Sequence, residues 1–91
     1  MRHLEFTTTD IELAAALMVA LNAKPSEIRP GKELVEFTFP KNEATESVIT
    51  KFAAGSLFQE VRRFASNRSW LYRQVREVAR TGKPWGGGHG R

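Results

Sequence analysis

Arginine is concentrated in the last third of the chain, with a spacing that could support phosphate binding. Residues 56–91 carry eight basic and two acidic residues, a net charge of +6, whereas residues 1–55 carry six basic and eight acidic residues, a net charge of −2. This asymmetry concentrates the electric field on one element and favours a polyanionic partner. Guanidinium groups and serine hydroxyls both donate hydrogen bonds to phosphate oxygens. The candidate residues are Arg62, Arg63, Ser66, Ser69, Arg73, Arg76, Arg80 and Lys83, with Arg91 at the end of the chain.

If this segment is a helix, most of these residues lie on one side of it. At about 100° per residue, with Val61 as the zero, the apolar residues of this segment span about −100° to +60°. Four arginines and two serines then fall between about 60° and 140°, at the edge of the apolar face. We call these six residues the Arg/Ser stripe: Arg62, Ser66, Ser69, Arg73, Arg76 and Arg80.

Two interpretations of the Arg/Ser stripe are open. It could be an ordinary solvated helix face, or it could bind phosphate. The stripe contains almost no compensating acid, whereas solvated helix faces commonly alternate charges so that residues four apart can pair. Acidic residues elsewhere could nevertheless neutralise it within the fold: Glu12, Glu27, Glu33, Glu36, Glu43 and Glu46.

Two tryptophans are candidates for binding a protein partner. Trp70 falls at about 180° on the same helix, where we expect it to face solvent in a monomer. Aromatic residues are enriched in protein interfaces, so an interface is favoured over base stacking, and a place in the core of a different fold stays open. Trp85 lies in the Gly-rich segment 83–91, which is typical of a disordered end. A tryptophan there would fold back on the domain or anchor in a partner.

The sequence carries no pattern for catalysis or metal binding. His3 and His89 lie at opposite ends of the chain, and neither stands beside a nucleophile in a motif. A phosphate-binding loop, a dinucleotide fingerprint and an HExxH motif are all missing. The chain contains no cysteine and therefore neither a disulfide nor a thiolate metal site. We expect a non-enzymatic protein without metal or cofactor.

The composition is that of one small domain with no membrane segment. The longest apolar run, Leu13–Leu21, is nine residues long. A helix needs about 20 apolar residues to span a bilayer. The run also follows a Thr/Asp-rich segment rather than the basic leader of a signal peptide. We expect a cytoplasmic protein.

Capping signals and periodicity predict the first helix. Thr9 at the N-cap and Glu12 three residues later match the capping box, and the helix should reach about Leu21, before Asn22 and Pro25. Its residues are apolar almost all round, which predicts burial on most sides.

A hairpin should follow. Ser26–Arg29 and Glu33–Phe39 are the predicted strands, with a turn at Pro30–Lys32. The alternation of residue types in the second strand directs one set of side chains toward the core: Val35, Phe37 and Phe39.

Two more helices complete the prediction. The range Asn42–Gly55 has an N-cap at its start and a glycine suited to a left-handed C-cap at its end. Ser56 and Gln59 form a second capping-box pair for the last helix, although the start could instead fall near Glu60. This helix should end at Gly82. Its apolar residues recur at spacings of three and four, interrupted only by Arg68: Leu57, Val61, Phe64, Leu71, Val75 and Val78. Four more residues lie beside them on the predicted apolar face: Phe58, Ala65, Tyr72 and Ala79.

Together these elements predict an α+β fold in the order α-β-β-α-α, with a two-stranded antiparallel hairpin packed against the helices. Residues 1–82 form the domain and residues 83–91 a Gly-rich basic tail. Two strands alone are marginally stable, so pairing of hairpins between subunits, and hence a homodimer, is reasonable.

The segment from Phe6 to Leu17, with its Thr-Asp-x-x-Leu-Ala-Ala-x-Leu pattern, resembles the opening of a small, functionally uncharacterised domain family. That family occurs in bacteria, their phages and integrative elements, and its members continue to a glycine after the second helix and a basic final helix. The resemblance covers about residues 6–80, and later matching positions are Gly55, Phe64, Leu71 and Arg73. The shorter hairpin turn and the Trp/Gly tail depart from the family. The family has no established binding residues to carry over. The resemblance implies a phage or mobile-element accessory protein, located in the cytoplasm of a bacterial host or in a virion.

We therefore expect a protein that binds nucleic acid through the Arg/Ser stripe, with Arg63, Lys83 and Arg91 extending the basic surface. The alternative is a protein-interaction module, such as an inhibitor of a host defence factor or an assembly or virion adaptor. It would dock Trp70, Trp85 and the arginines onto an acidic protein surface.

Overall fold

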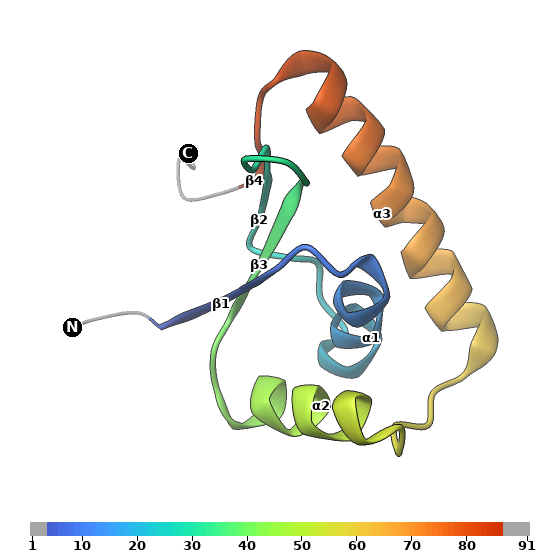
Figure 1. Ribbon diagram of the computed structural model, residues 1–91. Helices are drawn as coiled ribbons and strands as arrows, with labels where there is room; N and C mark the ends of the chain where they lie inside the picture. Colours follow the sequence, from blue (N-terminus) through green and yellow to red (C-terminus); the bar gives the residue numbers. More distant parts are fainter. Residues whose placement is uncertain (1–3, 87–91) are drawn as a thin grey trace.

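The computed structural model describes residues 4–86, which form three helices and four strands (Figure 1). The strands make one antiparallel sheet in the order β1-β3-β2-β4. This confirms an α+β fold and the predicted central order, but it adds the strands β1 and β4. The elements in chain order are β1 (Glu5–Thr8), α1 (Ile11–Leu21), β2 (Glu27–Arg29), β3 (Glu36–Pro40), α2 (Glu43–Ala54), α3 (Val61–Thr81) and β4 (Trp85–Gly86).

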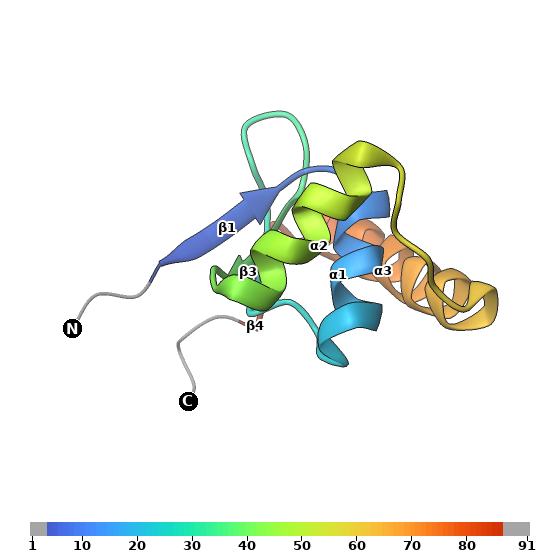
Figure 2. The same ribbon diagram turned by 90° about the horizontal axis from the view of Figure 1, so that it is seen from below.

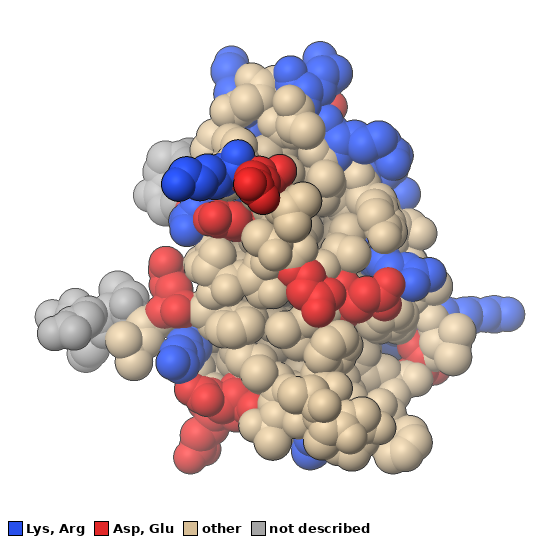
Figure 3. Space-filling model, in the orientation of Figure 1, with Lys and Arg blue, Asp and Glu red and all other residues tan. Residues whose placement is uncertain are grey.

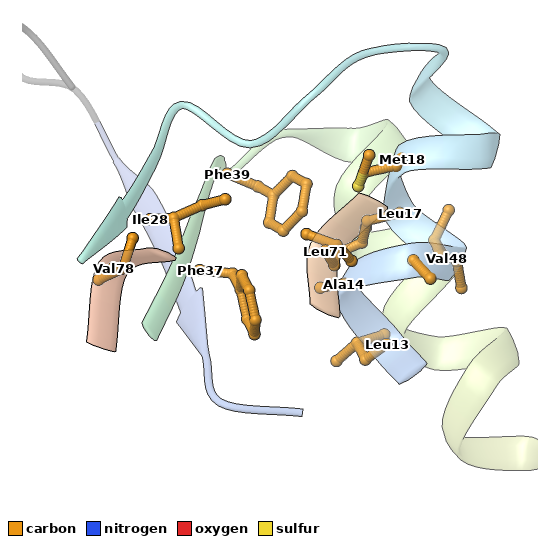
Figure 4. Packing of buried hydrophobic residues seen from close by; sticks show 12 residues of the cluster. Leu13, Ala14, Leu17, Met18, Ile28, Phe37, Phe39, Val48, Leu71 and Val78 are labelled. Carbon is orange, nitrogen blue, oxygen red and sulfur yellow. The ribbon is translucent and has the colours of Figure 1, made fainter. Parts of the chain in front are cut away.

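All three helices lie on one side of the sheet, with α1 between α2 and α3 (Figures 1 and 2). Every residue from Leu13 to Val19 in α1 is buried, as its apolar composition predicts. Phe37 and Phe39 of β3 and Ile28 of β2 pack against it from the sheet, and Leu71 of α3 packs from the helical side (Figure 4). The core therefore surrounds α1.

The start of α1 differs from the prediction by one residue. Asp10, not Thr9, is the N-cap, and its Oδ1 accepts hydrogen bonds from the N–H groups of Glu12 at 2.9 Å and Leu13 at 3.2 Å. A carboxylate is a charged acceptor that also interacts favourably with the positive end of the helix dipole. The hydroxyl of Thr8 in turn accepts from the Asp10 N–H at 3.0 Å, which fixes the step from β1 into α1.

The sequence did not predict strand β1, because Glu5–Thr8 is short and mostly polar and directly precedes the capping residues of a helix. Its register pairs Phe6 with Phe39, so Phe6 joins the face of the sheet that covers the core. The same alternation places Glu5 on the opposite face, together with Glu27, Arg29 and the buried Thr38. The sheet is four-stranded in one chain, which removes the marginal two-stranded hairpin as a reason to expect a homodimer.

The turn between β2 and β3 is longer than predicted, because β3 begins at Glu36 rather than Glu33. Gly31 lies so close to the Leu34 carbonyl oxygen that an added Cβ would stand 2.3 Å from it. Residues 30–35 therefore fold into a loop instead of extending both strands.

Helices α2 and α3 confirm most of their predicted caps. Asn42 accepts a hydrogen bond from the Thr45 N–H at 3.0 Å, and Gly55 and Gly82 end the two helices in the left-handed conformation. The capping-box pair of Ser56 and Gln59 is wrong, and the alternative start near Glu60 is correct: Glu60 is the N-cap of α3. The N–H of Ser56 donates to the Lys51 carbonyl and closes α2, and the chain then has no helical structure until Glu60.

The chain after α3 returns to the sheet. Trp85 and Gly86 form β4, which pairs antiparallel with β2. The Trp85 ring packs edge-on against Trp70 with the ring centroids 5.1 Å apart, and the Lys24 ammonium lies 4.8 Å from the Trp70 centroid. Trp85 thus folds back on the domain, which was one of its two expected places. Residues 87–91, the rest of the predicted tail, lie outside the described residues.

We predict that Trp70 and Trp85 stabilise the fold cooperatively. In a double-mutant cycle of Trp70→Ala and Trp85→Ala, the coupling free energy of unfolding should be about 1 kcal/mol, the usual contribution of an edge-to-face aromatic pair. Urea unfolding followed by circular dichroism measures it. A control cycle of Trp70→Ala with Leu34→Ala, a residue in the loop of the hairpin, should be additive. Additive effects of the two tryptophans would contradict the packing described.

Candidate nucleic-acid interface

The whole Arg/Ser stripe lies on the solvent-exposed face of α3, because its four arginines and two serines are all exposed. From Arg62 to Arg80 the stripe is about 27 Å long, at a rise of about 1.5 Å per residue. Helix α3 forms one side of the domain, so this face is turned away from the sheet and from α1 (Figure 1). The structure therefore brings together every predicted residue of the stripe.

The buried face of α3 is rotated relative to the prediction. Leu71 and Val78 are its buried residues and lie at about −80° to −100° on the helical projection. Val61 and Tyr72, at about 0° to 20°, were predicted to be buried but are 78% and 46% exposed. The centre of the buried face has moved by about 70° toward Trp70. The Arg/Ser stripe consequently lies opposite the buried face, in the middle of the exposed surface, and not at its edge.

The expectation that Trp70 faces solvent is wrong. Its side chain is half-buried between Trp85 of β4 and the Lys24 ammonium group. The prediction failed because the sequence gives no sign that β4 returns to this side of α3. A role of Trp70 and Trp85 in binding a protein partner stays a prediction, although both rings are already packed within the domain.

Acidic side chains elsewhere in the fold pair with cations outside the stripe. Glu12 contacts Arg68 at 3.1 Å, and Glu27 and Glu36 both contact Arg29 at 3.1 Å. The hydrogen bond with Glu36, and after it the one with Glu27, raises the pKa of the Arg29 guanidinium above its ordinary value. These contacts account for several of the acids that might have neutralised the stripe.

Within residues 4–86, Arg80 is the stripe residue that forms an ion pair, with Glu77. The side chains of Arg62, Arg73 and Arg76 make none with any described residue. Figure 3 shows basic side chains along the border of the molecule formed by α3, and most acidic ones over the sheet and the starts of α1 and α2. Most of the positive charge of the stripe is therefore not neutralised by an ion pair with a described residue.

The remaining predicted basic residues are placed apart from the stripe. Arg63 is exposed but lies at about 200° on the projection, and its Nη2 donates to Asn22 Oδ1 at 3.3 Å. Arg63 is thus directed toward the end of α1. Lys83 is exposed just beyond the end of α3, where it continues the basic surface. Arg91 lies outside the described residues.

Two features of this surface were not predicted. Tyr72 is exposed beside Arg73 and Arg76, and Phe58 is exposed in the link between α2 and α3. Both were predicted to lie on the apolar face of the last helix, beside its regularly spaced apolar residues. The competing start signal at Glu60 was the sequence feature that could have removed Phe58 from that helix.

Comparison of the chain with models of protein families, with curated proteins and with solved structures gave no match. Among the described residues, no group of three or more His, Cys, Asp or Glu side chains is placed to hold a metal ion. None of the described helices is both long enough and apolar enough to cross a membrane.

Arg73 and Arg76 are exposed and form no ion pair within residues 4–86, which predicts that neither supports the fold. The double variant Arg73→Glu/Arg76→Glu should change the free energy of unfolding by no more than about 0.5 kcal/mol, as is usual for surface positions without partners. Urea unfolding at low and at high salt measures this. A loss larger than about 2 kcal/mol would mean that the two arginines make contacts absent from this structure.

Proposed function

We propose that this protein binds nucleic acid through the phosphate backbone, using the Arg/Ser stripe of α3. The observation that carries the proposal is the row of exposed arginines of which three, Arg62, Arg73 and Arg76, have no ion pair among residues 4–86. Arginines that stabilise a fold through charge have acidic partners, and these three have none in the part of the chain that the structure describes. Free guanidinium groups along one straight element are suited to an extended polyanion.

The dimensions of the stripe fit this partner. Duplex DNA carries one phosphate per about 3.4 Å on each strand, so a surface of about 27 Å faces several phosphates of one strand. Ser66 and Ser69 lie between the arginines, and their short side chains let a phosphate backbone approach the helix closely. Lys83 extends the surface at the far end.

Acidic residues on the outer face of the sheet would orient an approaching polyanion toward α3. The outer face of the sheet carries Glu5, Glu27 and Glu36, with Arg29 as the neighbouring cation. A polyanion would be repelled from that face and drawn to α3. Such orientation raises the rate of productive encounter, and salt weakens it.

The biological setting of the proposal comes from the resemblance of residues 6–80 to a family found in bacteria, phages and integrative elements. In that setting the protein would be a non-enzymatic accessory factor of a phage or mobile element. It would act by occupying or organising nucleic acid, either in the cytoplasm of the host or in a virion.

The salt dependence of binding tests the proposal. With four arginines on phosphates, the plot of log K against log salt concentration for a 20-base-pair duplex should have a slope of about −3 to −4. Arg73→Glu/Arg76→Glu should weaken binding at least tenfold at low salt and reduce the slope by about 2, because two phosphate contacts are lost. Fluorescence anisotropy of a labelled duplex measures both quantities, with a single strand of the same length in parallel.

The matched control is Lys32→Glu/Lys41→Glu, which changes the net charge of the protein equally at two exposed positions away from α3. It should keep most of the affinity. Equal losses of DNA affinity in the two double variants would show that net charge alone causes the effect. That result would reject the stripe as a binding site. If neither duplex nor single strand binds at low salt, the function itself is wrong. Competition with polyglutamate distinguishes nucleic-acid binding from the alternative, docking on an acidic protein. A stripe that binds an acidic protein surface should prefer carboxylates to phosphates.

A further inference from the structure

Tyr72 is an exposed aromatic residue beside the Arg/Ser stripe. Its side chain is 46% exposed and does not belong to the apolar cluster that fills the core. The other two aromatic residues of α3, Phe64 and Trp70, both pack against that cluster. In the described part of the chain, neither a second aromatic ring nor a cation lies over the Tyr72 ring. The ring is therefore partly open to solvent and is not engaged in stacking within the domain.

Tyr72 lies near the middle of the stripe along the axis of α3. At a rise of about 1.5 Å per residue, Arg62 lies about 15 Å before Tyr72 and Arg80 about 12 Å after it. On the helical projection Tyr72 falls at about 20° and Arg76 at about 60°, and side chains four residues apart are neighbours on the surface of a helix. A strand whose phosphates follow the arginines would therefore pass the ring with charged contacts on both sides of it.

The two borders of the stripe differ in their chemistry. On the other border from Tyr72, Glu77 falls at about 160° and forms an ion pair with Arg80. On the Tyr72 border, between about 0° and 40°, the neighbouring side chains are apolar and either exposed or half-buried: Val61, Ala65 and Ala79. Nucleobases stack on aromatic side chains, and a carboxylate offers no such surface. The bases of a strand bound along the arginines would therefore lie on the Tyr72 border.

We propose that the Arg/Ser stripe and Tyr72 together bind single-stranded nucleic acid, with one base stacked on the Tyr72 ring. This inference rests on the proposed nucleic-acid binding and names the form of nucleic acid that the surface recognises. In a duplex the faces of the bases are covered by their neighbours in the stack, whereas a single strand can turn a base outward. Both forms share the phosphate contacts, and only the single strand adds the contact with Tyr72. Little sequence preference is expected, because every base has a face that can stack.

Fluorescence anisotropy with three labelled ligands of equal length tests the proposal: a single strand of mixed sequence, its duplex, and an abasic strand that keeps the phosphates and lacks the bases. At low salt the full-length protein should bind the single strand about tenfold more tightly than the abasic strand, a gain typical of one stacked base. This comparison uses the wild-type protein and does not depend on the folding of a variant.

Two substitutions of Tyr72 separate stacking from apolar contact. Tyr72→Leu keeps an apolar side chain but removes the aromatic face, so it should weaken binding of the single strand about tenfold and leave the abasic strand and the duplex unaffected. Its salt dependence should equal that of the wild type, because no phosphate contact is lost. The matched control, Tyr72→Phe, keeps the aromatic face and should bind as the wild type does. The midpoint of urea unfolding checks that both variants fold.

The possible outcomes distinguish this inference from the proposed function. The inference is wrong if the abasic strand binds as tightly as the single strand, or if Tyr72→Leu weakens duplex and single strand equally. In either case, weaker binding by Arg73→Glu/Arg76→Glu would still support the stripe as a phosphate-binding surface. Equal losses in Tyr72→Leu and Tyr72→Phe would assign the effect to the hydroxyl group and contradict stacking. If none of the three ligands binds at low salt, the proposed function fails, and this inference fails with it.

Discussion

The rest of the structure depends on the burial of α1. A helix whose residues from Leu13 to Val19 are all buried needs apolar cover on every side, and no single element supplies it. The sheet covers α1 on one side through Phe37 and Phe39, while α2 and α3 cover the others through residues such as Val48 and Leu71. Fully burying side chains of this size contributes about 1.5–3 kcal/mol each, so this arrangement outweighs the weaker surface interactions.

That constraint also decides which side of α3 faces solvent. Once Leu71 and Val78 pack toward α1 and the sheet, and Trp85 of β4 packs on Trp70, no element among residues 4–86 covers the opposite side of α3. The Arg/Ser stripe occupies that side. The acids of the domain are meanwhile used at helix starts and beside Arg29 and Arg68. The candidate interface is therefore a consequence of packing on the other face of the same helix.

The sequence predicted what depends on local signals. The burial of α1, the caps at Asn42, Gly55 and Gly82, and the inward side chains of Phe37 and Phe39 all follow from periodicity or from a single capping residue. It did not predict β1 or β4, because each is a short strand whose stability comes from pairing with a distant segment. Without β4, the rotation of α3 could not be foreseen, and the stripe was placed at the edge of the apolar face rather than opposite it. The exposure of Phe58 was not predicted for a related reason, since two start signals competed: Glu60 caps α3, while the Gln59 amide donates to the Ala16 carbonyl of α1.

A nuclear magnetic resonance titration of the arginine Nε–H signals with duplex DNA tests directly whether the outward arginines of α3 contact phosphate. Phosphate contact at the stripe predicts that the signals of Arg62, Arg73 and Arg76 shift as DNA is added, and that those of Arg29 and Arg68, which are held by glutamates, do not. Shifts confined to Arg29 and Arg68, or uniform small shifts of all arginines, would contradict it.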